Sequence, residues 1–129
     1  MKIIATTLAV ALILGNIGFA SSDDLPPSYT PTVHQIIVKA ATAYHIDPLP
    51  LYKVAKCESN LDIHAIGDHG LAIGLLQFHR ETFNQYAKQL EIQNPDINNP
   101  SQQAAVSAYM FSLHRQSAWT CYGKLYGKM

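Results

Sequence analysis

Residues 56–78, KCESNLDIHAIGDHGLAIGLLQF, begin at the end of an apolar helix and continue through a glycine-containing loop into a short apolar segment. Just upstream, Leu51, Val54 and Ala55 recur at spacings of three and four, which predicts a helix with one apolar side. Glu58 continues that side where the helix ends. An ionised carboxylate is costly to bury, so this position favours the protonated form and suits a general acid. The alternative is a glutamate that simply points into water.

Helical patterns also flank this stretch on both sides. The pairs Asp47–Pro48 and Asn99–Pro100 are helix start signals, in which an N-cap residue precedes a proline at the first helical position. The spacing of apolar residues predicts helices over residues 33–44, 48–59, 81–91 and 101–114.

The segments between these helices show turn signals. Residues 60–72 contain Asn, Asp and Gly and are predicted to form a loop, and residues 74–78 a short turn of helix or a strand-like piece. No segment alternates convincingly as a strand. We therefore expect a mostly α, compact single domain from about residue 33 to residue 129.

The N-terminus has the composition of an export signal. Lys2 precedes an uncharged, mostly apolar run that ends in small residues at Ala20, so residues 1–20 are predicted to be a cleavable signal peptide. The alternative is an uncleaved anchor, since a membrane span needs about 20 residues. Residues 21–32 contain three prolines and no apolar period, and we expect a linker. The predicted location is secreted or periplasmic, with no stable membrane insertion after cleavage.

Composition narrows the range of partners. The chain has 129 residues and a formal net charge of zero, so no charged field indicates nucleic acid as a partner. His64, His69 and His79 with Asp68 match no known zinc spacing, and there is no glycine-rich phosphate loop. We expect no metal, no cofactor and a monomer.

The sequence has two cysteines, Cys57 and Cys121. In an exported protein an even pair indicates one disulfide, which would stabilise the fold by about 4 kcal/mol through loop closure. Two free buried thiols are the alternative.

Three motifs occur together in one order: Glu58-Ser59, then a loop with Gly67 and Gly70, then Gly74-Leu75-Leu76-Gln77. This set resembles the lytic transglycosylase family of peptidoglycan enzymes, which shares the lysozyme-like fold. The resemblance covers about residues 46–121. It implies a lysozyme-like domain that acts on the glycan strands of peptidoglycan.

The resemblance also implies roles for the matching residues. Glu58 would protonate the glycosidic oxygen and then act as a base, and Ser59 would help hold the site. Gln77 would hydrogen-bond the sugar at its N-acetyl group, and Gly74 would let the backbone approach the glycan. The alternatives are a solvated Gln77 and a plain turn at Gly74.

The chain departs from the family pattern near its C-terminal helix. The family often has an Ala-Tyr-Asn-Ala-Gly segment whose tyrosine supports the catalytic glutamate, and this sequence has none. Tyr109 is its nearest counterpart as a substrate-site residue, although a core position also fits it. The ending at Trp119 and Cys121 resembles small disulfide-bearing relatives, in which the second cysteine would tie the C-terminus to the helix of Glu58.

The resemblance implies cleavage between N-acetylmuramic acid and N-acetylglucosamine without water. The N-acetyl group assists, and a 1,6-anhydromuramoyl end forms, so Glu58 suffices. A hydrolytic lysozyme would need a second carboxylate, for which Asp62, Asp68 and Glu81 are candidates by position. A non-catalytic peptidoglycan-binding protein of the same fold is the third interpretation.

Overall fold

The computed structural model describes residues 30–127. The predicted signal peptide and all but the end of the predicted linker lie outside these residues. Within residues 30–127, no helix has both the length and the apolar character needed to cross a membrane.

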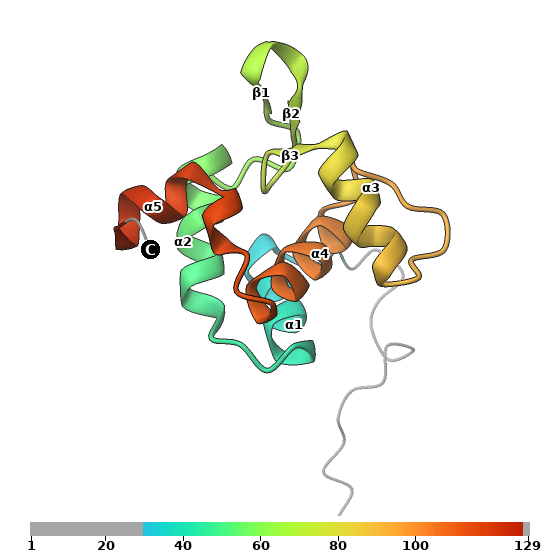
Figure 1. Ribbon diagram of the computed structural model, residues 1–129, viewed down its shortest axis with the longest axis horizontal. Coiled ribbons are helices and arrows are strands. Elements are labelled where there is room, and N and C mark those ends of the chain that lie inside the picture. Colours follow the sequence, from blue (N-terminus) through green and yellow to red (C-terminus); the bar gives the residue numbers. More distant parts are fainter. Residues whose placement is uncertain (1–29, 128–129) are drawn as a thin grey trace, which may run out of the picture. The chain divides into compact units, whose positions relative to one another are not determined.

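The described residues form five α-helices, two short 3-10 helices and a small antiparallel sheet (Figure 1). The prediction of a mostly α domain is confirmed. In chain order the elements are α1 Val33–Ala43, α2 Pro48–Ser59, β1 Ile66–Gly67, η2 Asp68–Gly70, β2 Ala72–Ile73, β3 Phe78–His79, α3 Arg80–Gln89, α4 Pro100–Ser112, η3 Gln116–Ala118 and α5 Thr120–Tyr126.

The helix starts follow local capping chemistry. The Asp47 side chain accepts the amide of Leu49 at 2.9 Å, and a proline occupies the first helical position of α2. Asn99 caps α4 in the same way. Both predicted start signals are therefore confirmed, because an N-cap side chain satisfies amides that have no partner within the helix.

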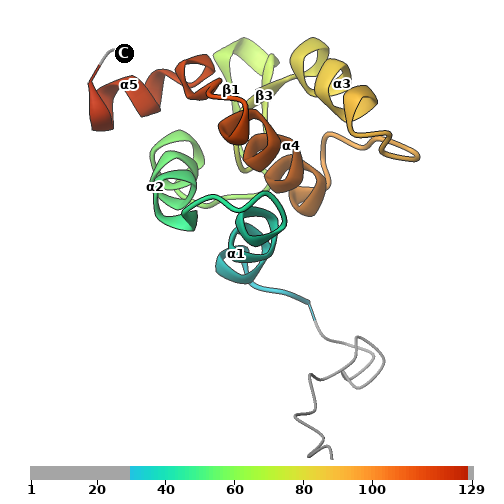
Figure 2. The same ribbon diagram turned by 60° about the horizontal axis from the view of Figure 1, so that its bottom comes forward.

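The helices pack around α4, which contacts α1, α2 and α3, while α5 lies beside α2 (Figures 1 and 2). The apolar side of α2 is buried as predicted, with Leu51, Val54 and Ala55 fully enclosed. Gln103 and Ser107 of α4 are the buried polar side chains among the described residues. Gln103 hydrogen-bonds the turn that precedes Gln77, as described below.

Two features differ from the sequence prediction. The predicted loop, residues 60–72, contains strand β1 and the first residue of β2; β1 and β2 pair with each other, and β2 also pairs with β3. Each strand has only two residues, too few for an alternating pattern to show. The helix α5 was not predicted, because its seven residues include glycine and tyrosines and lack an apolar period.

Candidate active site

Glu58 lies in the last turn of α2, facing the start of α5. Its Oε1 accepts the backbone N–H of Cys121 at 3.3 Å. Cys121 is also disulfide-bonded to Cys57, the residue before Glu58, with a Cα–Cα distance of 5.9 Å. The predicted disulfide is confirmed, and it joins the two helix ends that surround the carboxylate.

The electrostatics of Glu58 favour its protonated form. Partial burial raises the pKa of the Glu58 carboxyl above its ordinary value, because the surrounding protein solvates the ionised form poorly. The hydrogen bond from Cys121 and the positive charge of Lys124 oppose this effect without cancelling it. A carboxyl with a raised pKa remains available as a proton donor at higher pH than a solvated one.

The raised pKa predicts how stability depends on pH. The folded state binds the Glu58 proton more tightly than the unfolded state does, so the contribution of this group to the free energy of unfolding is highest below the ordinary pKa of 4.5. This stabilising contribution should fall as the pH rises through the raised pKa of Glu58. Since Glu58 is only partly buried, we expect a loss of no more than about 1 kcal/mol.

Urea unfolding at a series of pH values measures this effect. Glu58→Gln should not show this part of the loss, whereas Glu81→Gln, at an exposed position of α3, should retain it. Parallel pH profiles for the native protein and the Glu58 variant would contradict the assignment.

Glu58 opens into a cleft of about 440 Å³. Most of the lining side chains are polar. The cleft is lined by Glu58, Asp68, Ala72, Gln77, His79, Thr82, Ala118, Trp119 and Thr120.

Gln77 is held in one orientation at the edge of this cleft. Its side-chain Nε2 donates to the backbone oxygens of Ala65 at 3.1 Å and Gly74 at 2.9 Å. Both amide hydrogens are then used, so only Oε1 remains to meet a ligand. Gln77 therefore offers a ligand an acceptor and no donor, which suits the N–H of an acetamido group.

Gly67 leaves the space that Gln77 needs. A Cβ on Gly67 would collide with Oε1 of Gln77, although the Gly67 backbone, with φ −134°, is open to any residue. We expect Gly67→Ala to displace the Gln77 amide and break its two hydrogen bonds. The expected result is a fall of roughly 10-fold in kcat/KM for the peptidoglycan cleavage proposed below. The free energy of unfolding should also fall, by about 1 kcal/mol.

A double-mutant cycle checks the cause. In a Gln77→Ala background the Gly67→Ala change should have little further effect, because the colliding group is absent. An equal loss in both backgrounds would mean that Gly67 acts independently of Gln77.

Three side chains distant in sequence hold the turn that carries Gln77. The Ser59 hydroxyl donates to the Leu75 oxygen at 2.7 Å, and the Trp119 indole N–H donates to the Leu76 oxygen at 2.9 Å. Buried Gln103 accepts the Leu76 amide at 2.9 Å. The end of α2, the start of α5 and the core helix α4 thus meet at one turn.

Gly74 makes room for Gln103. Its φ is +76°, which favours glycine, and a Cβ there would collide with the Gln103 side chain. Gln103 uses the space to donate to the oxygens of Ile73 at 2.9 Å and Ile97 at 2.6 Å. The structure therefore places Gly74 behind the turn, outside the lining of the cleft. Sequence reasoning missed Gln103, because a polar residue in an apolar helix has no local signal.

Tyr109 lies away from the cleft lining. Its ring packs between Tyr44 and Tyr86, with centroid distances of 5.7 and 6.3 Å, and its hydroxyl donates to the Gln89 side chain at 3.3 Å. These contacts place Tyr109 among α1, α3 and α4, where its side chain is partly exposed.

Of the three candidate second carboxylates, only Asp68 lines the cleft. It lies 3.0 Å from Nε2 of His79, which also lines the cleft. Asp68 and the following His69 both have positive φ, near 50°, an arrangement that is uncommon outside glycine. Within residues 30–127, no three His, Cys, Asp or Glu side chains are grouped as a metal would require.

The family model described as Transglycosylase SLT domain matches residues 35–120, which is more than half of the chain. No curated protein and no solved structure matches the chain. The matched segment includes the end of α2, the sheet, the turn at residues 74–77 and the first residue of α5.

Proposed function

Because the chain belongs to the transglycosylase SLT family, whose members act on peptidoglycan, we propose that it cleaves glycan strands between N-acetylmuramic acid and N-acetylglucosamine without water. The observation that carries the proposal is Glu58, a partly buried carboxyl with a raised pKa that opens into a polar cleft. Its pKa suits a group that gives a proton and then takes one back.

The proposed reaction has two proton transfers, both at Glu58. The protonated carboxyl gives its proton to the glycosidic oxygen, and the bond from that oxygen to C1 of the muramoyl residue breaks. The acetamido oxygen stabilises C1, and Gln77 Oε1 orients this group by accepting its N–H. The 6-hydroxyl then attacks C1 and returns its proton to Glu58. No water is consumed, and the muramoyl end is a 1,6-anhydro sugar.

Asp68 supports a second candidate function, a hydrolytic muramidase. Hydrolases of this kind use a second carboxylate to activate water or to form a covalent intermediate. Asp68 shares the cleft with Glu58, but its pairing with His79 engages one carboxylate oxygen. We therefore favour the route that needs Glu58 alone.

Mass spectrometry of the soluble fragments tests the two routes. Fragments one water lighter than hydrolysis products, at a rate that Asp68→Asn changes only a few-fold, are expected for the transglycosylase. Ordinary reducing ends that disappear in Asp68→Asn would instead indicate the muramidase. Absence of fragments from folded, disulfide-bonded protein would favour a binding protein of the same fold.

The disulfide supports the proposal that the protein is exported and is either secreted or periplasmic. Disulfides form and persist in oxidising compartments, and the Cys57–Cys121 bond is built into the surroundings of Glu58.

A further inference from the structure

The helix α5 is held to the rest of the domain mainly through Cys121. Among the seven residues of α5, Cys121 alone is buried, with 6% of its surface exposed, and residues 124–126 are exposed. Within residues 30–127, a single hydrogen bond joins α5 to another helix, from the Cys121 N–H to Glu58 at 3.3 Å. The disulfide between Cys57 and Cys121 is therefore the strongest connection of α5 to the domain.

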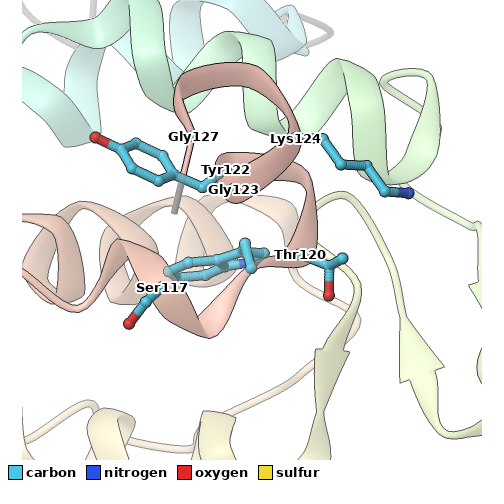
Figure 3. A pocket seen from close by; sticks show the side chains of 7 residues that line it. Ser117, Thr120, Tyr122, Gly123, Lys124 and Gly127 are labelled. Carbon is cyan, nitrogen blue, oxygen red and sulfur yellow. The ribbon is translucent and has the colours of Figure 1, made fainter. Parts of the chain in front are cut away.

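The non-covalent contacts of α5 are too few to order it by themselves. The Tyr122 ring packs edge-on against Phe111 of α4, with ring centroids 5.8 Å apart, whereas Figure 3 shows Thr120 and Lys124 directed to the other side of this segment. A helix this short is marginal in water, because ordering its residues costs more conformational entropy than its few hydrogen bonds return. Gly123 lowers its helix propensity further. We expect α5 to form only while the disulfide holds its first turn in place.

The residue before α5 does not depend on the disulfide. The Trp119 side chain is buried and donates to the Leu76 oxygen at 2.9 Å. Its ring also packs against Phe78, with centroids 5.6 Å apart. The chain up to Trp119 should therefore stay in place when the disulfide opens, and residues 120–126 should not.

The two cysteines differ in their access to solvent. Cys57 is exposed at the end of α2, whereas Cys121 is buried. A dithiol from solvent can therefore attack the Cys57 sulfur, which forms a mixed disulfide and releases Cys121 as a thiolate that takes up a proton. The second thiol of the donor then displaces Cys57, and the donor leaves as a cyclic disulfide. Two electrons and two protons pass to the protein, and the reverse reaction restores the bond.

We propose that the Cys57–Cys121 disulfide is a redox switch that orders α5 and thereby activates the Glu58 site. In the oxidised form Thr120 completes the lining of the cleft, and the Cys121 N–H meets Glu58. In the reduced form residues 120–126 detach, and Glu58 loses this wall while the core remains folded. The effect on cleavage rests on the proposed function. A chain that is oxidised only after export is then inactive in a reducing compartment.

Hydrogen exchange of the purified protein in oxidised and in reduced dithiothreitol tests the switch. Reduction should lower the protection of the amides in residues 120–126 by roughly 10-fold or more, while the amides of α4 remain protected. The kcat for peptidoglycan cleavage should fall by roughly 10-fold or more, and both properties should recover on reoxidation. The control is the double variant Cys57→Ser, Cys121→Ser, which should show the reduced values in both buffers.

A second variant tests whether helix formation limits the reduced form. A Cβ on Gly123 would meet no atom within 4 Å, so Gly123→Ala adds helix propensity without a collision. In the reduced protein it should raise the protection of residues 120–126 by about 4-fold. No gain in protection would contradict the ordering of α5 as the step that the disulfide controls.

Unchanged protection of residues 120–126 on reduction would overturn the inference. Loss of protection throughout the domain would also overturn it, because the disulfide would then stabilise the whole fold without switching α5. Native kcat in a reduced protein whose α5 exchanges freely would overturn the link to the Glu58 site. If the protein cleaves peptidoglycan in neither form, the proposed function fails by itself, and hydrogen exchange still decides whether the disulfide orders α5.

Discussion

The Glu58→Gln variant is expected to cleave peptidoglycan roughly 100- to 10 000-fold more slowly than the native protein, with the fold intact. Glutamine has nearly the same shape as glutamic acid but cannot transfer a proton. In the proposed reaction both the departure of the glycosidic oxygen and the attack of the 6-hydroxyl pass a proton through this one group. The loss should therefore appear in kcat rather than in KM.

The hydrogen bond between the side chain at position 58 and the Cys121 N–H should survive this substitution. The side-chain oxygen of the introduced glutamine can still accept the Cys121 N–H, the contact that joins α2 to α5. Binding of glycan strands should remain within a few-fold of the native value, measured by calorimetry on soluble strands. Glu81→Gln, on the exposed side of α3, is the matched control and should retain full activity.

Near-native cleavage by Glu58→Gln would contradict the proposal. Asp68 would then be the next candidate for the acid, because it is the other carboxylate in the cleft. Loss of both binding and cleavage, with a changed melting transition, would instead mean that the native carboxyl group is needed for the structure of the cleft.

The sequence predicted those parts of the molecule that depend on short-range patterns. The start of α2 follows from Asp47 and the following proline, and the buried side of α2 from residues at spacings of three and four. The same periodicity predicts that Glu58 lies at the end of that apolar side. These signals lie within one or two helical turns, so the sequence is enough to read them.

What could not be predicted depends on contacts between distant segments. Gln103 supports the turn of Gln77 from 27 residues away, and the Trp119 indole reaches the Leu76 oxygen across 43 residues. Neither residue type is unusual where it stands in the sequence. The space beside Gly74 is occupied by the Gln103 side chain, a contact between distant segments that the sequence around Gly74 does not indicate.

Removal of the disulfide is expected to cause the largest loss of stability. Replacing Cys57 and Cys121 together by Ser should reduce the free energy of unfolding by about 4 kcal/mol, because the unfolded chain regains the freedom of a loop that spans 64 residues. Urea unfolding of the native and double-variant proteins measures the difference. Reduction of the native protein should produce the same shift, and the variant should not respond to reductant.

The disulfide variant also separates stability from catalysis. Where the variant is still folded, α5 is attached to α2 by weaker contacts alone, so the backbone N–H at position 121 no longer has a fixed position opposite Glu58. We expect kcat to fall by roughly 10-fold or more under those conditions, since a general acid must be held within a fraction of an ångström of its target. Native kcat in a folded but destabilised variant would show that the bond serves stability alone, and that the core contacts of Trp119 suffice to position α5.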